Sequence, residues 1–369
     1  MIVIYIGEHE GHEEGYGMKL IIRDKYFNPV YVCLLILSLF LLSTACYAEN
    51  KVLSVTITDW LNDKNAALSI TFDDGTQDQI LYGIPLLKQY QLNATFYLPT
   101  SQIKNWDTWR KAFMAGNEIG SHSALHKNLK QLPSDAMINE LRTSYENITK
   151  EIRIQQCTTI AYPFGGIDPN IISKAKNYYV AGRLARKSTI IINEYSNIDL
   201  YQLKAFGLSD ETTVKDLNQK LIELHQKKGW LIEAIHGIKH PSHTHKTGWR
   251  PVPYSILKQH FKDIEQAKDT LWIAPVNVIA SYMRQKKDVV LELTKIDDAH
   301  YKILLSIKNI FPSCLSPLTI KLHITENALL HSVKHHNRTV PYKCKKGTCI
   351  FSITPDHSPV VLRVGGQVL

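Results

Sequence analysis

The pattern that most restricts the fold is an alternation of short apolar runs with amphipathic stretches, which extends from about residue 52 to residue 284. The runs at 67–72, 94–98 and 230–235 have the length and apolar character of buried strands. The segment 133–153 between them has the periodicity of an amphipathic helix. Strands that alternate with helices are typical of a parallel α/β sheet or barrel, and this is the fold class we predict.

The sequence pattern changes after residue 287, where strand-like runs follow one another with turns between them and no helical pattern. These runs are 289–293, 301–307, 318–324, 349–353 and 360–364. We therefore predict a small β-sandwich over 286–369, after an α/β domain over 49–285. A chain of 369 residues is long enough for two such domains. The sandwich would support the first domain or bind carbohydrate.

Composition excludes several classes of protein. Apolar residues make up 44% of the chain and charged residues 21%, which excludes a disordered chain, a collagen-like fibre and a multi-span membrane protein. The formal net charge is +9, but no Lys/Arg-rich helix with interleaved aromatic residues accompanies it. We therefore expect no nucleic-acid partner.

Residues 1–48 have the character of a targeting segment. The apolar run at 30–42 has 13 residues, which is short for a membrane span. Three basic residues precede it: Lys19, Arg23 and Lys25. Small residues follow it near Ala48, so we predict a signal peptide cleaved there, export of the protein, and membrane contact through the signal only. An uncleaved anchor and a lipoprotein lipidated at Cys46 are the alternatives.

Met18 directly precedes the basic part of this predicted signal, and residues 1–17 form an acidic prefix. We therefore expect translation to start at Met18. A peptide spanning Gly17 and Met18 in the unprocessed protein would contradict this expectation.

Two cysteines near the C-terminus, Cys344 and Cys349, flank a predicted turn. In an oxidising compartment the natural interpretation is a disulfide across a hairpin. A zinc site and two free thiols are the alternatives.

The strongest chemical motif is Thr-Phe-Asp-Asp-Gly at 71–75, at the end of a predicted buried strand. The side chains of Asp73 and Asp74 should diverge, because neighbouring residues of an extended chain point to opposite faces. One carboxylate can then bind a cation while the other faces a substrate. An ordinary surface turn is the alternative.

Three further motifs occur at predicted strand ends. His122 and His126 are four residues apart, a spacing that puts both imidazoles on one face of a helical turn, where with a carboxylate they can bind a divalent ion. His236 follows the run 230–235, and the glycines of 161–166 permit close backbone approach to a ligand. A buried core histidine and a plain turn are the alternatives for these last two.

The order Thr-Phe-Asp-Asp-Gly, His-Ser-Ala-Leu-His and Ala-Ile-His-Gly resembles the polysaccharide deacetylase family, the NodB-homology enzymes of carbohydrate esterase family 4, over roughly residues 66–285. The resemblance implies a distorted (β/α) barrel and a hydrolase that acts on acetylated glycans.

The resemblance also implies roles for individual residues. Asp74, His122 and His126 would hold a divalent metal ion, most often Zn, with Co, Ni, Mn or Fe as alternatives. Asp73 would be the general base and His236 the general acid. The backbone N–H of Phe164 would help stabilise the oxyanion.

One position departs from the family pattern. Many members carry an Arg that orients the base two residues before the Pro of the motif that here spans 161–166, where this chain has Ala161. Arg183 or Arg186 would supply the charge instead, although surface exposure is the simpler interpretation of both. The candidates for a carboxylate that orients His236 are Asp199 and Asp210.

Several residues are candidates for the site mouth. We expect substrate contacts from Tyr162, Trp249 and Arg183. Trp106 and Trp109 would either stack on sugar or pack in the core. The histidines at 240, 243 and 245 would either form a second metal site or lie in a loop over the mouth.

The resulting prediction is a metal-dependent deacetylase that hydrolyses N-acetyl groups of an extracellular or cell-wall polysaccharide. An O-acetyl esterase of the xylan type is the alternative among enzymes. A glycan-binding protein with a decayed site is the alternative outside them.

Overall fold

The structure is a computed structural model that describes residues 3–5, 19–21, 51–153, 158–184, 191–242, 247–307 and 314–366. The chain divides into two compact units, residues 1–50 and 51–369. In the first unit, β1 (Val3–Tyr5) pairs antiparallel with β2 (Lys19–Ile21). None of the helices in the described ranges has the length and apolar character needed to cross a membrane. The predicted signal at 30–42 and its cleavage site near Ala48 lie outside the described residues.

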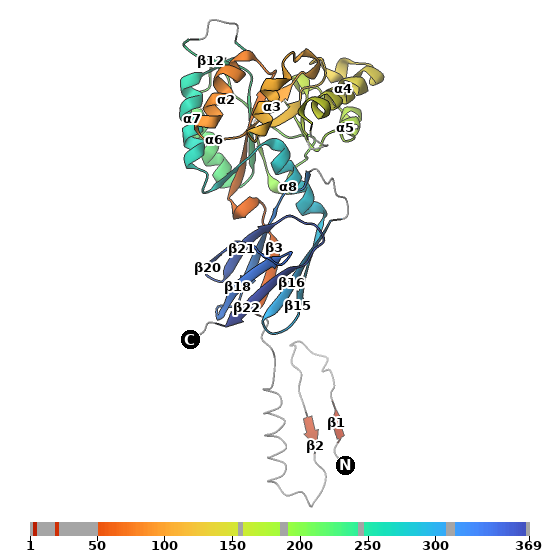
Figure 1. Ribbon diagram of the computed structural model, residues 1–369, viewed down its shortest axis with the longest axis vertical. Helices are drawn as coiled ribbons and strands as arrows, with labels where there is room; N and C mark the ends of the chain where they lie inside the picture. The colour runs from red at the N-terminus through yellow and green to blue at the C-terminus, as the bar shows by residue number, and fades with distance from the viewer. Residues whose placement is uncertain are drawn as a thin grey trace, which may run out of the picture. The chain divides into compact units, whose positions relative to one another are not determined.

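Within residues 51–369, a parallel sheet forms the centre of the α/β domain (Figure 1). Its strands run in the order β10 (Phe206–Gly207), β11 (Trp230–Ile235), β4 (Ala66–Asp73), β5 (Ala94–Leu98), β6 (Glu118–Ser121), β7 (Ile160–Ala161) and β8 (Gly182–Arg183). Two further strands join it: β9 (Ile192–Asn193) on β11 and β14 (Leu271–Ile273) on β4.

The two ends of this sheet meet. Arg183 of β8 forms a parallel bridge with Leu203, and a few residues later the same segment becomes β10, which pairs with β11. The sheet therefore closes on itself as a distorted (β/α) barrel, which confirms the predicted fold. Closure brings Arg183, at the last strand of the path, close to residues of β4.

Helices connect the barrel strands, and one further helix follows β14 (Figure 1). They are α2 (Ile84–Gln89), α3 (Trp106–Met114), α4 (Ser134–Ile152), α5 (Pro169–Ala175), α6 (Val214–Lys227), α7 (Tyr254–Gln266) and α8 (Val276–Asp288). Pro85 is tolerated near the start of α2 because the first helical N–H groups need no intrahelical acceptor. Helix α6 begins at a capping box between Thr213 and Asp216.

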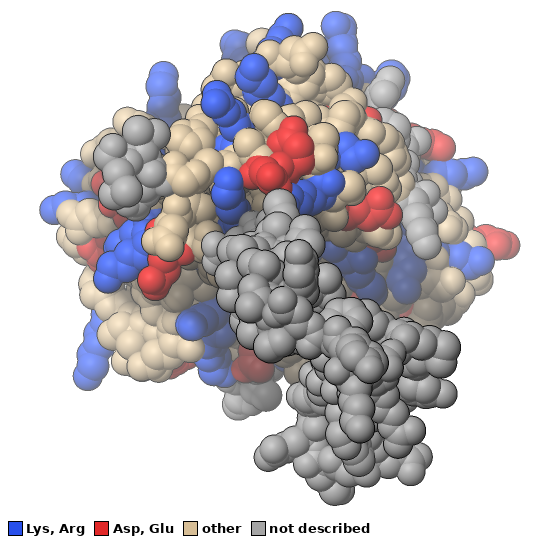
Figure 2. Space-filling view, turned by 90° about the horizontal axis from the view of Figure 1, so that it is seen from below, with Lys and Arg blue, Asp and Glu red and all other residues tan. Residues whose placement is uncertain are grey.

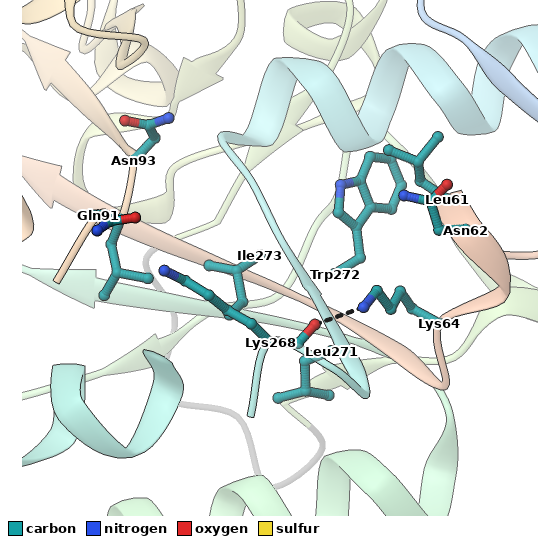
Figure 3. A pocket seen from close by; sticks show the side chains of 10 residues that line it. Leu61, Asn62, Lys64, Gln91, Asn93, Lys268, Leu271, Trp272 and Ile273 are labelled. Carbon is teal, nitrogen blue, oxygen red and sulfur yellow. Dashed lines mark hydrogen bonds between the residues drawn. The ribbon is translucent and has the colours of Figure 1, made fainter. Parts of the chain in front are cut away.

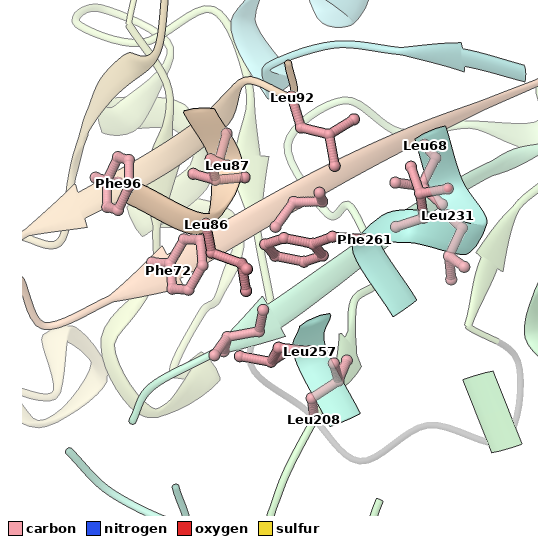
Figure 4. Packing of buried hydrophobic residues seen from close by; sticks show 14 of the residues in the cluster. Leu68, Phe72, Leu86, Leu87, Leu92, Phe96, Leu208, Leu231, Leu257 and Phe261 are labelled. Carbon is pink, nitrogen blue, oxygen red and sulfur yellow. The ribbon is translucent and has the colours of Figure 1, made fainter. Parts of the chain in front are cut away.

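Strand β4 divides the barrel domain into an apolar outer layer and a polar interior. Leu68 and Phe72 point outward and pack with side chains of α2 and α7, including Leu86 and Phe261 (Figure 4). The intervening residues point to the opposite face, since side chains alternate along a strand. Asp73, the last residue of β4, therefore has its carboxylate inside the barrel, where it is fully buried.

The second domain is a sandwich of two antiparallel sheets. One has the order β15 (Val289–Lys295), β16 (His300–Ile307), β22 (Val360–Gly366), β18 (Ala328–His335) and β19 (Arg338–Thr339). The other has the order β20 (Tyr342–Lys345), β21 (Thr348–Ile353), β17 (Leu318–Ile324) and β3 (Val52–Ile57). A separate apolar cluster fills the space between them.

Strand β3 differs from the predicted domain boundaries. It precedes the barrel in sequence, but it pairs with β17 of the sandwich from Ile57 opposite Ile320 to Val52 opposite Ile324. Val52 is buried in the sandwich cluster. The predicted start of the α/β domain at residue 49 is therefore corrected, because residues 52–57 pair with a strand of the sandwich. The division near residue 285 remains a prediction.

Charged side chains are dispersed over the part of the molecular surface that Figure 2 displays, with Lys and Arg set among acidic and neutral residues. Some of the lysines of the second unit are paired: Lys321 lies 2.8 Å from Asp63 and Lys286 lies 2.6 Å from Asp59.

Cys344 and Cys349 form a disulfide between the paired strands β20 and β21, which decides between the three interpretations of this pair. Cys349 is fully buried in the sandwich core. The bridge closes a short loop, with a sequence separation of 5.

Reduction of this disulfide should destabilise the sandwich. A loop of this length restricts the unfolded chain by about 2 kcal/mol, so the free energy of unfolding should fall by about that amount in a reductant. Urea titrations with and without dithiothreitol measure the difference. A Cys344→Ala/Cys349→Ala variant is the control and should show no response, and a wild-type midpoint unchanged by reductant would contradict the prediction.

Candidate active site

The carboxylates of Asp73 and Asp74 diverge at the end of β4, as the sequence predicts. Asp73 bonds to Arg183 inside the barrel. Asp74 comes one residue later with a positive φ of 77°. This backbone turn directs its carboxylate away from Arg183 and toward His122 and His126.

Asp74, His122 and His126 bring their ligand atoms together. Asp74 Oδ1 lies 3.7 Å from His122 Nε2 and 3.4 Å from His126 Nε2, and the two Nε2 atoms are 3.2 Å apart. Ligands at about 2.0–2.1 Å from a tetrahedral zinc ion are separated by about 3.3 Å. The three residues therefore fit a tetrahedral metal ion with one position left for water or substrate.

The loop that carries the two histidines is not the helical turn that their spacing suggested. Ser123 and His126 both have positive φ, 61° and 58°. Ser123 Oγ accepts the N–H of His126 at 3.0 Å, and Glu140 accepts the N–H of Leu125 at 2.8 Å. Side-chain acceptors thus replace the helical hydrogen bonds and still bring the imidazoles together.

His122 is prepared to act as a neutral ligand. Its Nδ1 lies 2.7 Å from the carbonyl oxygen of Ala161. A carbonyl can only accept, so Nδ1 carries the proton and the lone pair of Nε2 faces Asp74 and His126. Burial of the ring lowers the pKa of His122 to about 4, and the charge of Asp73 offsets only part of this shift.

A buried ion pair holds Asp73. Arg183 donates from its guanidinium to Asp73 Oδ1, and both side chains are 0% exposed. Burial alone would raise the pKa of Asp73, but the charge of Arg183, with smaller electrostatic contributions from His122 and His236, outweighs burial and lowers this pKa to about 2. Asp73 Oδ2 has no hydrogen-bond partner among the described residues. The carboxylate is therefore ionised, fixed by one oxygen and unbonded at the other.

The position of Arg183 corrects two expectations. It is neither exposed on the surface nor open to substrate, because barrel closure buries it beside Asp73, with its guanidinium 5.0 Å from the ring centre of Tyr97. Arg183 thus supplies from β8 the charge that Ala161 of β7 lacks. Arg186 lies outside the described residues.

His236 completes the group. Its Nε2 lies 3.6 Å from Asp73 Oδ2, and its side chain is 18% exposed. The ring of Trp249 stands edge-on to it, with 5.0 Å between ring centres. Asp210 instead pairs with Arg250, and Asp199 bonds to residues of its own turn, so the printed contacts of neither include His236.

Two residues that the sequence analysis did not identify hold His236 in place. Gln79 donates through Nε2 to the carbonyl oxygens of Asp73 and His236, the latter at 2.6 Å. Asp78 is fully buried and accepts the N–H groups of Ile238 and Gly248. Both residues follow the Asp-Asp motif closely in sequence, and this proximity was the signal that could have found them.

The segment 161–166 carries two aromatic rings, one exposed at the surface and one buried in the core. Phe164 has a positive φ of 56°, is 63% exposed, and lies 4.8 Å from the ring centre of His126. Tyr162 is fully buried in an apolar cluster, against Gly182, so the expected substrate contact is wrong for Tyr162. Its ring fits there because Gly182 has no side chain.

The other candidates have different surroundings. Trp109 is buried in the core and Trp106 packs against the same cluster, so packing explains both. His240 stacks on Tyr82, with ring centres 4.3 Å apart. His243 and His245 lie outside the described residues. Trp249 is 65% exposed beside His236, and its contact with a substrate stays a prediction.

A hollow of about 200 Å³ occurs at the other end of the barrel (Figure 3). Its lining comes from the residues that precede or begin the strands, such as Lys64 before β4 and Asn93 before β5. Lys64 donates to the carbonyl oxygen of Lys268 at 2.6 Å across it. The metal-ligand set and Asp73 lie at the carboxyl ends of the strands, where ligands of parallel α/β folds bind.

Residues 61–181 match the family model described as polysaccharide deacetylase. The match includes Asp73, Asp74, His122 and His126 and ends before Arg183 and His236.

Two curated relatives are similar over part of their length. A gellan lyase from a Bacillus species is 26% identical over 284 residues, which cover 72% of this chain and 11% of that protein. The peptidoglycan-N-acetylglucosamine deacetylase PgdA of Listeria monocytogenes is 26% identical over 109 residues, 29% of this chain and 23% of PgdA. The chain thus spans less than a quarter of either protein.

Similar solved structures include peptidoglycan deacetylase PdaC from Bacillus subtilis, with a TM-score of 0.41, 16% identity, and coverage of 60% of this chain and 93% of that one. The Xyl-CE4 domain of a multidomain xylanase from the hindgut metagenome of Trinervitermes trinervoides has a TM-score of 0.41, 18% identity, and coverage of 61% and 92%.

Loss of Arg183 should cost stability, because it leaves the buried charge of Asp73 unpaired. We expect Arg183→Met to lower the free energy of unfolding by about 3–5 kcal/mol. Arg250→Met removes a half-exposed arginine that pairs with Asp210 and Glu211, and it should lower the free energy of unfolding far less. Urea unfolding measures both variants.

The ion pair between Asp73 and Arg183 should also make the stability of the protein depend on pH. Because the pKa of Asp73 is lowered from 3.8 to about 2, its contribution is complete above pH 3.8 and is lost as the pH falls through about 2. The stability difference between the wild type and Asp73→Asn should therefore shrink over this interval. A difference independent of pH there would contradict the assignment.

Proposed function

We propose that this protein is a metal-dependent deacetylase that hydrolyses N-acetyl groups of an extracellular or cell-wall polysaccharide. The observation that carries the proposal is the convergence of Asp74, His122 and His126 beside the ionised carboxylate of Asp73. The family match over 61–181 supports hydrolysis of an acetylated glycan.

A divalent ion held by these three residues would polarise an acetyl carbonyl and acidify water, and zinc suits the two imidazoles and one carboxylate. Asp73 accepts the proton of the attacking water through its unbonded Oδ2, while Arg183 keeps the other oxygen fixed. With a pKa of about 2, Asp73 is ionised at neutral pH but is a weak base. Efficient transfer therefore requires an acidified water.

We assign to His236 the protonation of the leaving group. Its Nε2 is 3.6 Å from Asp73, so an acid and a base face the same space. An amide needs such an acid more than an ester does, because an amine leaves poorly unless it is protonated. This requirement favours N-acetyl over O-acetyl substrates. The N–H of Phe164, beside His126, is proposed as the oxyanion donor.

Two exposed aromatic residues provide surfaces for a sugar. Phe164 adjoins the metal-ligand set through His126, and Trp249 adjoins His236. Each is more than 60% exposed, so the faces of both rings are open to stack on a sugar. We assign them to the substrate-binding surface, in place of Tyr162 and Arg183.

The ion pair with Arg183 also bears on the decayed-site alternative. Ala161 was the departure that suggested decay, and the structure has an arginine on Asp73 despite it. Export is proposed from the predicted signal at 30–42, and the disulfide between Cys344 and Cys349 supports an oxidising compartment.

The proposal predicts acetate release from N-acetylated glycans such as chitooligosaccharides, peptidoglycan fragments or poly-N-acetylglucosamine. Release should stop in a chelator and return with Zn²⁺. Asp73→Asn should lower kcat about 100-fold or more. Asp107→Asn is the matched control and should keep the wild-type rate, because Asp107 is exposed on α3 and pairs with Arg110.

Acetylated xylan is assayed beside these substrates. Release from xylan alone would support the O-acetyl esterase instead. Absence of release from every N- and O-acetylated glycan by folded, metal-loaded protein would overturn the proposal and leave the glycan-binding alternative.

A further inference from the structure

A second group of metal-ligating side chains lies in the sandwich domain, which the catalytic proposal does not use. It consists of His335, His336 and Asp356, which we call the sandwich histidine cluster. Each offers a ligand atom, and these atoms lie within 4.8 Å of one another. Among the described residues, this cluster and the set Asp74, His122 and His126 are the two groups with this property.

The two imidazoles approach opposite oxygens of one carboxylate. His335 Nε2 lies 3.1 Å from Asp356 Oδ1, and His336 Nε2 lies 2.5 Å from Asp356 Oδ2. The ring centres of the two histidines are 4.3 Å apart. All three side chains thus converge on one place, and at both imidazoles it is the Nε2 atom that does so.

The backbone produces this convergence. Neighbouring residues of a strand point to opposite faces, so His335 and His336 would diverge if β18 continued. The chain turns at His336 and Asn337, which have positive φ of 51° and 60°. This two-residue hairpin between β18 and β19 brings the ring of His336 to the same side as that of His335.

Asp356 comes from a different part of the sandwich, the segment before β22. Its Oδ1 also accepts the N–H of Ser358 at 3.0 Å, which fixes the carboxylate. His335 is opposite Val360 in the register of β18 and β22, so the strand pairing holds the segment beside the hairpin. The cluster is open to solvent, with side-chain exposures of 13% for His335, 55% for His336 and 36% for Asp356.

We propose that the sandwich histidine cluster binds a second divalent transition-metal ion, with Zn²⁺ as the most suitable. Two imidazole nitrogens and a carboxylate oxygen are borderline ligands that favour zinc and its neighbours over magnesium or calcium, and water would complete the coordination. The ion would link the β18–β19 hairpin to the segment before β22. This site is independent of the deacetylase proposal, because it uses no residue of the barrel.

The test measures zinc binding by the untagged full chain after chelation and dialysis. A background variant, His122→Ala/His126→Ala, removes the barrel ligands, so that calorimetric titration with Zn²⁺ reports the sandwich cluster. Adding Asp356→Asn to this background should weaken zinc binding about tenfold or more. Adding Asp297→Asn is the matched control, since Asp297 contacts one histidine, His300, and should leave binding unchanged.

His336→Ala in the same background gives a second route, because His336 is the most exposed member and its loss should perturb the fold least. Circular dichroism checks the folding of each variant. If the background variant binds no zinc, or if both Asp356→Asn and His336→Ala leave its affinity unchanged, the second site is wrong. Asp356→Asn in the wild-type chain should not alter acetate release, so failure here is distinct from failure of the proposed function.

Discussion

The ion pair between Asp73 and Arg183 is the interaction on which the rest of the site depends. Both side chains are fully buried, and a lone carboxylate in that position would have a raised pKa. Arg183 reverses this effect and keeps Asp73 ionised. With Oδ1 engaged by arginine, Asp73 is held away from the role of metal ligand, and we propose Asp74, with His122 and His126, for that role. Two adjacent aspartates thereby acquire different tasks.

Barrel closure makes this pairing available. Asp73 ends the central strand β4 and Arg183 ends the short strand β8, four strands along the sheet. In an open sheet these residues would be far apart. The bridge from Arg183 to Leu203, and the pairing of β10 with β11, return the sheet to β4 and turn both side chains into one interior. The fold therefore supplies from a distant strand what Ala161 does not.

The parts of the site predictable from sequence were those that one segment determines. The divergence of Asp73 and Asp74 follows from strand alternation, and the location of His236 follows from the end of an apolar run. The sequence left Arg183 and Arg186 as alternative partners of Asp73, because the pairing depends on barrel closure. The pairing of β3 with β17 was missed for a similar reason, since partners about 265 residues apart leave no local pattern. The loop at 122–126 differs from a helical turn because side chains of Ser123 and Glu140 bond to its backbone.

The division of work between the two aspartates is tested most directly by a crystal structure of the zinc-loaded protein with anomalous diffraction recorded at the zinc edge. The account predicts a strong peak coordinated by Asp74 Oδ1, His122 Nε2 and His126 Nε2, with Asp73 bonded to Arg183 and outside the coordination shell. A zinc ion ligated by Asp73, or no peak between Asp74 and the two histidines, would contradict it.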